Sequence, residues 1–197
     1  MQLKTLICAA VAAGAASFAS TASAAVTIDI VQRGGDIVAT ASGALDLTGL
    51  KALGERDQHP WVIGSVGAIT LGPDAHGDSY ITLTGPASFG PGFLVGASSS
   101  SGDTFTLVGG NGAVSVPVGY VSGAPISSSD TFSGHTLADL GLTAGRYAFT
   151  APDDTLTLNI GAVPEPATWA VMLLGVGMVG ACLRISRRKD TVCSLAG

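Results

Sequence analysis

Val26-Thr-Ile-Asp-Ile-Val31 and Asp36-Ile-Val-Ala-Thr-Ala41 stand on either side of Gln32-Arg-Gly-Gly35, and this stretch decides the fold class. Both runs are short and are bounded by turn residues, and their Val, Ile and Thr content is typical of β-strands. The Gly-Gly pair between the runs favours the tight turn of a hairpin. The stretch therefore predicts an antiparallel β-hairpin with one face in a core.

Apolar and polar residues alternate in Thr155-Leu-Thr-Leu-Asn-Ile160, and that period of two is typical of a half-buried β-strand. Gly-, Pro- and Ser-rich turns separate further short β-type runs, which lie at residues 61–66, 68–71, 80–84, 93–95, 104–108, 113–118 and 146–150. A short helix is expected at residues 137–140, with Thr136 as its N-cap and Gly141 as its stop. Strands spaced in this way predict a mainly β domain over residues 25–162, an antiparallel β-sandwich or jelly roll.

Charge and cysteine content restrict the function of this segment. The whole chain of 197 residues has a net charge of -5, and residues 25–162 carry twelve acidic residues against four cations. Nucleic acid is therefore not an expected partner, because phosphate binding needs a basic face. Cys8, Cys182 and Cys193 all lie outside the segment. It has no disulfide framework, no thiol nucleophile and no cysteine-based zinc site.

The first 24 residues predict a signal peptide. Lys4 precedes an apolar run, and the segment closes with small residues at Ala22 and Ala24. A cation, a short apolar core and an Ala-x-Ala site are the signature of export. We expect export through the Sec translocon and cleavage by signal peptidase after Ala24.

An uncharged apolar run near the C-terminus predicts one transmembrane helix. It covers residues 167–183, and 17 residues at about 1.5 Å each reach about 25 Å, just enough for a thin membrane. Gly177 and Ala181 form a small-xxx-small pair on which another helix could pack. The cations that follow place the C-terminus in the cytoplasm by the positive-inside rule; they are Arg184, Arg187, Arg188 and Lys189.

Val163-Pro-Glu-Pro-Ala-Thr-Trp-Ala170, the apolar helix and the basic cluster resemble the PEP-CTERM sorting signal of Gram-negative bacteria, in its Trp-Ala subtype. The resemblance covers residues 163–189, with residues 190–197 left as a cytoplasmic tail. Its motif residues are Val163, Pro164, Glu165, Pro166, Trp169 and Ala170. The resemblance implies recognition by exosortase, a membrane cysteine transpeptidase that cuts near Pro164-Glu165-Pro166 in bacteria that make exopolysaccharide. It also implies an inner-membrane-anchored precursor with a periplasmic passenger, which reaches the cell surface or the medium after processing.

Blocks within the exported segment are similar to passengers of other PEP-CTERM proteins whose function is unknown. They include Leu45-Asp-Leu-Thr-Gly-Leu50, Gly85-Pro-Ala-Ser-Phe-Gly90, Val116-Pro-Val-Gly-Tyr-Val-Ser-Gly123 and Asp154-Thr-Leu-Thr-Leu158. This likeness brings no activity with it. We expect no catalytic residues and no cofactor.

The segment offers few residues for catalysis or metal binding. His59, His76 and His135 stand outside any hydrolase or metalloprotease motif. Asp74 and Asp78, in Asp-Ala-His-Gly-Asp, are candidate metal ligands, because alternate residues of an extended chain share a face. A solvated Asx turn is the competing interpretation of this stretch.

Two function classes remain. The first is a noncatalytic surface or matrix protein associated with exopolysaccharide, with Trp61, Phe89 or Tyr120 as candidate glycan-binding aromatics. The second is a secreted hydrolase that acts on glycans through two carboxylates about 5 to 9.5 Å apart. We expect the first, because the segment contains no recognisable catalytic motif.

Overall fold

The computed structural model describes residues 25–161 of the chain. The predicted signal peptide, sorting signal, transmembrane helix and cytoplasmic tail lie outside the described residues. Between residues 25 and 161, no helix combines the length and the apolar character needed to cross a membrane.

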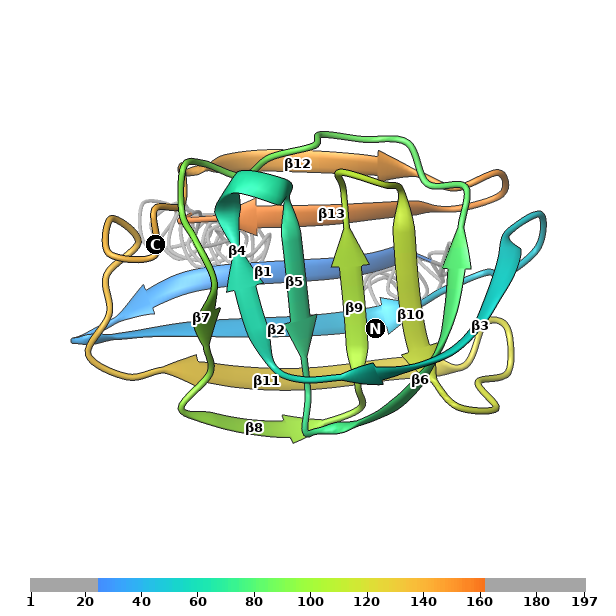
Figure 1. Ribbon diagram of the computed structural model, residues 1–197, viewed down its shortest axis with the longest axis horizontal. Coiled ribbons are helices and arrows are strands. Elements are labelled where there is room, and N and C mark those ends of the chain that lie inside the picture. The colour runs from blue at the N-terminus through green and yellow to red at the C-terminus, as the bar shows by residue number, and fades with distance from the viewer. Residues whose placement is uncertain (1–24, 162–197) are drawn as a thin grey trace, which may run out of the picture. The chain divides into compact units, whose positions relative to one another are not determined.

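The described chain is mainly β-structure, arranged as two sheets (Figure 1). Neighbours in the six-stranded sheet follow the order β12 (Gly145–Thr150), β13 (Thr155–Ile160), β1 (Ala25–Arg33), β2 (Asp36–Ala44), β11 (Pro125–Phe132) and β8 (Ser99–Gly102). The order in the seven-stranded sheet is β3 (Lys51–Gln58), β6 (Ala75–Ile81), β10 (Ala113–Pro117), β9 (Phe105–Val108), β5 (Ala68–Leu71), β4 (Trp61–Ile63) and β7 (Val95–Gly96). Figure 1 shows the strands of the second sheet crossing in front of those of the first. The expectation of a β-rich domain with antiparallel sheets is confirmed.

The predicted hairpin is present and is longer than the sequence pattern suggested. β1 and β2 pair from Thr27 opposite Ser42 to Arg33 opposite Asp36. Gly34 closes the turn at φ 63, in the left-handed region that glycine adopts without a steric penalty. The other edge of β1 pairs in parallel with β13, the last strand. β1 therefore lies inside its sheet, with a partner on both sides.

Several other strands agree closely with the sequence pattern. β5 and β13 have the predicted bounds, and β9, β10 and β12 differ from them by one residue at one end. The run at residues 61–66 divides into β4 and a 3₁₀ turn at Gly64–Val66. β3, β8 and β11 were not predicted, because β3 is exposed at seven of its eight positions and β8 and β11 are rich in serine.

The predicted helix at residues 137–140 is wrong, although its two end signals are correct. Thr136 and Asp139 bond reciprocally, with the Asp139 N–H 3.2 Å from Thr136 Oγ1 and the Thr136 N–H 2.8 Å from Asp139 Oδ2. Gly141 then takes φ 59, and Leu142 N–H donates to the Leu137 carbonyl at 2.9 Å, as in a Schellman ending. The Thr136–Asp139 capping pair and the Gly141 ending are so close together in the sequence that only a single turn forms between them.

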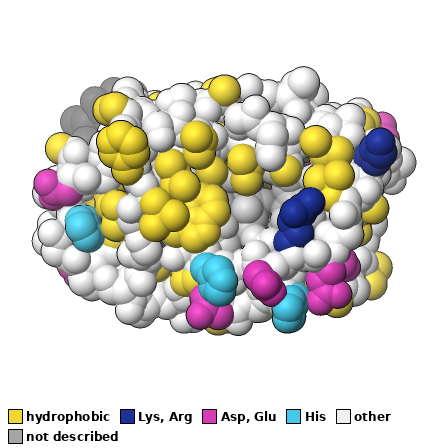
Figure 2. Space-filling model, viewed as in Figure 1, with side chains coloured by type: hydrophobic (Ala, Val, Ile, Leu, Met, Phe, Trp, Pro, Cys, Tyr) yellow, Lys and Arg dark blue, Asp and Glu magenta, His cyan; other side chains and the backbone are white. Residues whose placement is uncertain are grey.

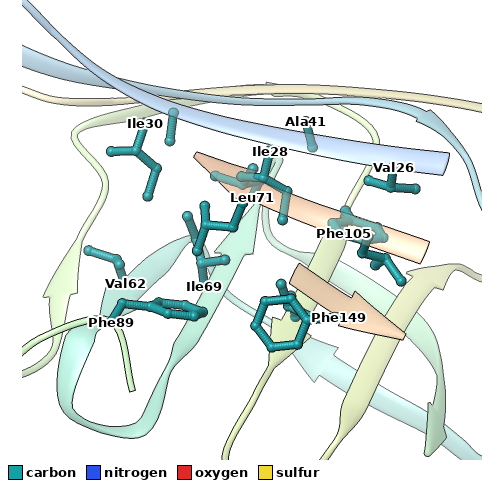
Figure 3. Packing of buried hydrophobic residues seen from close by; sticks show 14 of the residues in the cluster. Val26, Ile28, Ile30, Ala41, Val62, Ile69, Leu71, Phe89, Phe105 and Phe149 are labelled. Atoms are coloured by element: carbon teal, nitrogen blue, oxygen red, sulfur yellow. The ribbon is translucent and has the colours of Figure 1, made fainter. Parts of the chain in front are cut away.

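The core lies between the two sheets and is built from side chains of both. Ile28 on β1 points toward Ile69 and Leu71 on β5, and all three are fully buried (Figure 3). Phe89, from the segment between β6 and β7, lies edge-on to Phe149 of β12 with ring centroids 6.0 Å apart. This single apolar core is what holds the cysteine-free domain together.

Asp130 is a buried carboxyl group on the inward face of β11. It is 1% exposed, and its Oδ1 accepts a hydrogen bond from Gly72 N–H at 2.9 Å. Gly72 follows β5, so this bond joins the two sheets. Oδ2 has no hydrogen-bond partner among the described residues. Burial raises the pKa of Asp130 to about 6.

We predict that Asp130→Asn removes the part of the pH dependence of the unfolding free energy that comes from the titration of Asp130. The pKa of an unfolded aspartate is about 3.9, so the folded state holds the proton more tightly than the unfolded state does. The stability that this group contributes is complete below pH ~4 and is lost as pH rises to about 6, a change of about 3 kcal/mol. Urea unfolding between pH 4 and 7 measures this change.

The matched control is Asp153→Asn, at an exposed turn position. We expect the difference in unfolding free energy between Asp130→Asn and the wild type to grow in favour of the variant from pH 4 to pH 6. The Asp153 variant should follow the wild-type curve. A difference for Asp130→Asn that stays constant with pH would contradict this assignment.

Candidate functional site

The outer face of the seven-stranded sheet carries a groove of about 320 Å³, which we call the outer groove. Its floor and walls come from β3, β4, β6, β9, β10 and the β9–β10 turn, through Leu53, Arg56, Asp57, Gln58, Trp61, Ser79, Thr106, Val108, Asn111, Ala113 and Ser115. Side chains alternate between the faces of a strand. Leu107 and Val114 therefore enter the core, whereas Thr106 and Ser115 face outward into the groove.

A short connection forms this groove. Only His59 and Pro60 separate β3 from β4 in the sequence, but four strands lie between them in the sheet. In a flat sheet that separation would be about 24 Å. Three Cα–Cα steps reach at most about 11 Å. The end of β3 must therefore bend over the outer face, and Figure 1 shows the link crossing in front of the sheet.

The bend brings Gln58, at the end of β3, over the floor of the groove. Its Oε1 accepts a hydrogen bond from Thr106 Oγ1 of β9 at 2.5 Å. Its Nε2 lies 3.5 Å from Ser115 Oγ of β10. Ser115 also pairs with Ser79 Oγ of β6 at 2.8 Å, and Thr106 with Thr70 Oγ1 of β5 at 2.9 Å. A ladder of hydroxyl groups and one amide therefore runs across four strands.

The rim of the groove combines apolar and polar groups. Trp61 is half-buried at one side, while Arg56, Asp57 and Asn111 are exposed around the opening. Figure 2 looks onto this face and shows hydrophobic side chains gathered near its middle, beside a basic side chain. An indole face beside convergent donors and acceptors is suited to binding a small polar molecule with an apolar side.

A row of histidines and carboxylates lies along the same face, toward the ends of β3 and β6 (Figure 2). His76 Nδ1 is 2.8 Å from Asp57 Oδ1 and 3.7 Å from Glu55 Oε1. All three side chains are more than half exposed. Exposed pairs of this kind contribute little to stability, because water screens them.

The two candidate metal ligands are engaged separately. Asp74 Oδ1 lies 3.1 Å from His59 Nδ1, and Asp78 Oδ2 accepts a hydrogen bond from Gly119 N–H at 2.8 Å. Across residues 25–161, the structure brings together no group of three or more His, Cys, Asp or Glu side chains that could hold a metal ion.

The three aromatic candidates for glycan binding have different surroundings. Trp61 lines the outer groove. The expectation for Phe89 is wrong, because its side chain is 0% exposed and packs against the rings of Tyr147 and Phe149. Its sequence surroundings, rich in Gly and Pro, resemble a surface loop and gave no sign that this segment inserts into the core.

Tyr120 is half-buried and holds two loops together through its hydroxyl group. The oxygen accepts from Leu45 N–H at 2.9 Å, and the hydroxyl donates to the Ala124 carbonyl at 2.5 Å. Burial raises the pKa of this hydroxyl group. Its polar atom is therefore occupied within the protein.

We predict that Tyr120→Phe destabilises the domain by about 1 to 2 kcal/mol, because it leaves a backbone donor and a backbone acceptor without their partner. Chemical denaturation measures the loss. Tyr80→Phe is the matched control, since the Tyr80 hydroxyl makes no hydrogen bond to another described residue. Equal stabilities for the two variants would argue against this stabilising role of the Tyr120 hydroxyl group.

Comparison with known families identifies one segment of the chain. Residues 162–189 match the family model described as the PEP-CTERM protein-sorting motif. No curated protein and no solved structure matches the chain. The match contains the predicted motif residues, the small-residue pair at Gly177 and Ala181, and the basic cluster. It thereby confirms the resemblance on which the sorting prediction rests.

Proposed function

We propose that this chain, whose residues 162–189 carry the PEP-CTERM sorting motif, is an exported, noncatalytic surface or matrix protein. In this proposal exosortase recognises the motif in an inner-membrane-anchored precursor and cuts near Pro164-Glu165-Pro166. The β-domain is the passenger, which remains outside the cell in association with exopolysaccharide. The single observation that carries the sorting step is the match at residues 162–189.

The limits of the β-domain support this order of events. β1 starts at Ala25, the first residue that the structure describes, and so lies wholly after the predicted signal-peptide cut at Ala24. β13 ends at Ile160, and Gly161 N–H donates to the Ile30 carbonyl at 2.8 Å. Cuts after Ala24 and near Pro164 would therefore leave every strand that the structure describes within the released domain.

The chemistry of the motif also suits cleavage. Pro164 and Pro166 lack an amide hydrogen and disfavour helix, which favours an extended backbone that a peptidase cleft can accept. Glu165 between them offers an anion to a recognising cation. The uncharged run at residues 167–183 and the cations after it would hold the precursor in the membrane, with this tripeptide on the outer side.

We predict that replacing Pro164-Glu165-Pro166 by three alanines reduces processing about tenfold or more, which corresponds to about 1.4 kcal/mol in the barrier. The measurement is the intact mass and the cell fraction of the protein in a host that has exosortase. Thr168→Ala, at a variable position of the motif, is the matched control and should be processed normally.

Two results would refute parts of this proposal. A triple-alanine variant that is processed like the wild type would remove the role of the tripeptide. Release of reducing ends from polysaccharide by the purified protein, lost in Glu55→Gln or Asp57→Asn, would favour the glycan hydrolase instead. Those two carboxylates flank His76 on the exposed edge of the sheet.

A further inference from the structure

We propose that the outer groove is a binding site for a short segment of neutral glycan, with Trp61 as its stacking surface and the hydroxyl ladder as its polar floor. This inference rests on the proposed association of the passenger with exopolysaccharide, and it names the site and the class of sugar. The groove volume of about 320 Å³ lies at the lower end of ordinary ligand pockets, which span about 300 to 1,000 Å³. A single short stretch of a sugar chain matches that size.

The floor has donors and acceptors that its own hydrogen bonds leave free. Ser79 and Ser115 share one hydrogen bond, so one of their two hydroxyl hydrogens remains available. The Gln58 amide hydrogens have only long contacts among the described residues, at 3.4 Å to the Arg56 carbonyl and 3.5 Å to Ser115 Oγ. All three side chains are at most 7% exposed. Buried polar groups of this kind gain most from a partner that both donates and accepts, as a sugar hydroxyl does.

Trp61 supplies the apolar part of the site. A sugar ring has one face made largely of C–H groups, and a flat indole covers such a face without requiring polar contacts. Trp61 is held from both sides, since β4 pairs with β5 and β7 at this residue. Only the side-chain torsions of Trp61 then remain to be ordered when a ligand arrives, which limits the loss of conformational entropy.

Charge favours a neutral sugar over an acidic one. Residues 25–161 carry twelve acidic residues and four cations, so the domain repels polyanions at long range. At the rim, Arg56 and Asp57 oppose one another in sign. Both can bond to uncharged hydroxyls, and because Asp57 offsets the charge of Arg56, the rim has no net positive charge to attract a uronate carboxylate.

The experiment uses the indole as its own reporter. The chain has two tryptophans, Trp61 and Trp169, so Trp169→Phe leaves Trp61 as the only source of indole fluorescence. The full chain carrying this change is titrated in a sugar-free detergent with neutral oligosaccharides of glucose, galactose and mannose, and separately with an oligouronate. We expect a saturable change in fluorescence with at least one neutral oligosaccharide and weaker binding of the oligouronate.

Variants then locate the site, with binding of the responsive oligosaccharide measured by calorimetry. Trp61→Ala and Ser115→Ala should each weaken binding about tenfold, which corresponds to about 1.4 kcal/mol. Arg56 is exposed at the rim of the groove, so Arg56→Ala tests the site even if the other two variants fold poorly. This variant should also weaken binding. Phe93→Ala, at a side chain that is 82% exposed and outside the groove, should bind like the parent chain.

Three results would overturn the inference: no binding of any neutral sugar, preferential binding of the oligouronate, or unchanged affinity in folded groove variants. Export and cleavage are followed separately in the wild-type chain, which keeps Trp169. If the wild-type chain is exported and cleaved normally but the domain does not bind these sugars, the proposed sorting function stands and only the glycan site falls. If export or cleavage of the wild-type chain fails, the proposed function falls whatever the binding result.

Discussion

The pairing of β1 on both of its edges is the constraint on which the passenger fold depends. β1 is the first strand of the described chain, and it lies between its hairpin partner β2 and the last strand, β13. The parallel ladder runs from Ala25 opposite Thr155 to Ile30 opposite Ile160. The six-stranded sheet can therefore be completed only after the whole domain has been made, since β1 and β13 lie more than a hundred residues apart in the sequence. Such long-range pairing is intrinsically slow to form, because a large loop must close first.

The six-stranded sheet packs against the inner face of the seven-stranded sheet. The outer face of the seven-stranded sheet is left free. Ile28 on β1 packs toward Ile69 and Leu71, and the bond from Gly72 to Asp130 ties the end of β5 to β11. The core thus takes the inward side chains of β5, β9 and β10. On the outer face each of these strands carries one hydroxyl group, at Thr70, Thr106 and Ser115, and the bent end of β3 lies over them to form the groove. The fold and the candidate site therefore use opposite faces of the same strands.

Local sequence pattern was sufficient for short runs of apolar and β-branched residues bounded by turn residues, such as β1, β2 and β13. It was insufficient for β11, where Ser128 and Asp130 occupy two of the four inward positions, and for β3, which lies at a sheet edge and buries almost nothing. The groove could not be predicted, because it depends on which strands become neighbours. Gln58 and Thr106 are 48 residues apart in the chain, and nothing near either residue signals that they meet. Trp61 was recognised as a candidate from its chemistry alone.

The placement of β13 also determines how the passenger responds to mechanical force. The chain leaves the domain at Gly161, at the end of a strand that has β12 on one side and β1 on the other. A pull along the backbone at this point acts parallel to β13 and loads its two ladders in shear. Many hydrogen bonds then share the load, whereas peeling an edge strand would break them one at a time. Because β1 and β13 are parallel, tension between Ala25 and Gly161 also shears this pair. A passenger dragged by its surroundings while still tethered would therefore resist unravelling from the end at which it is held.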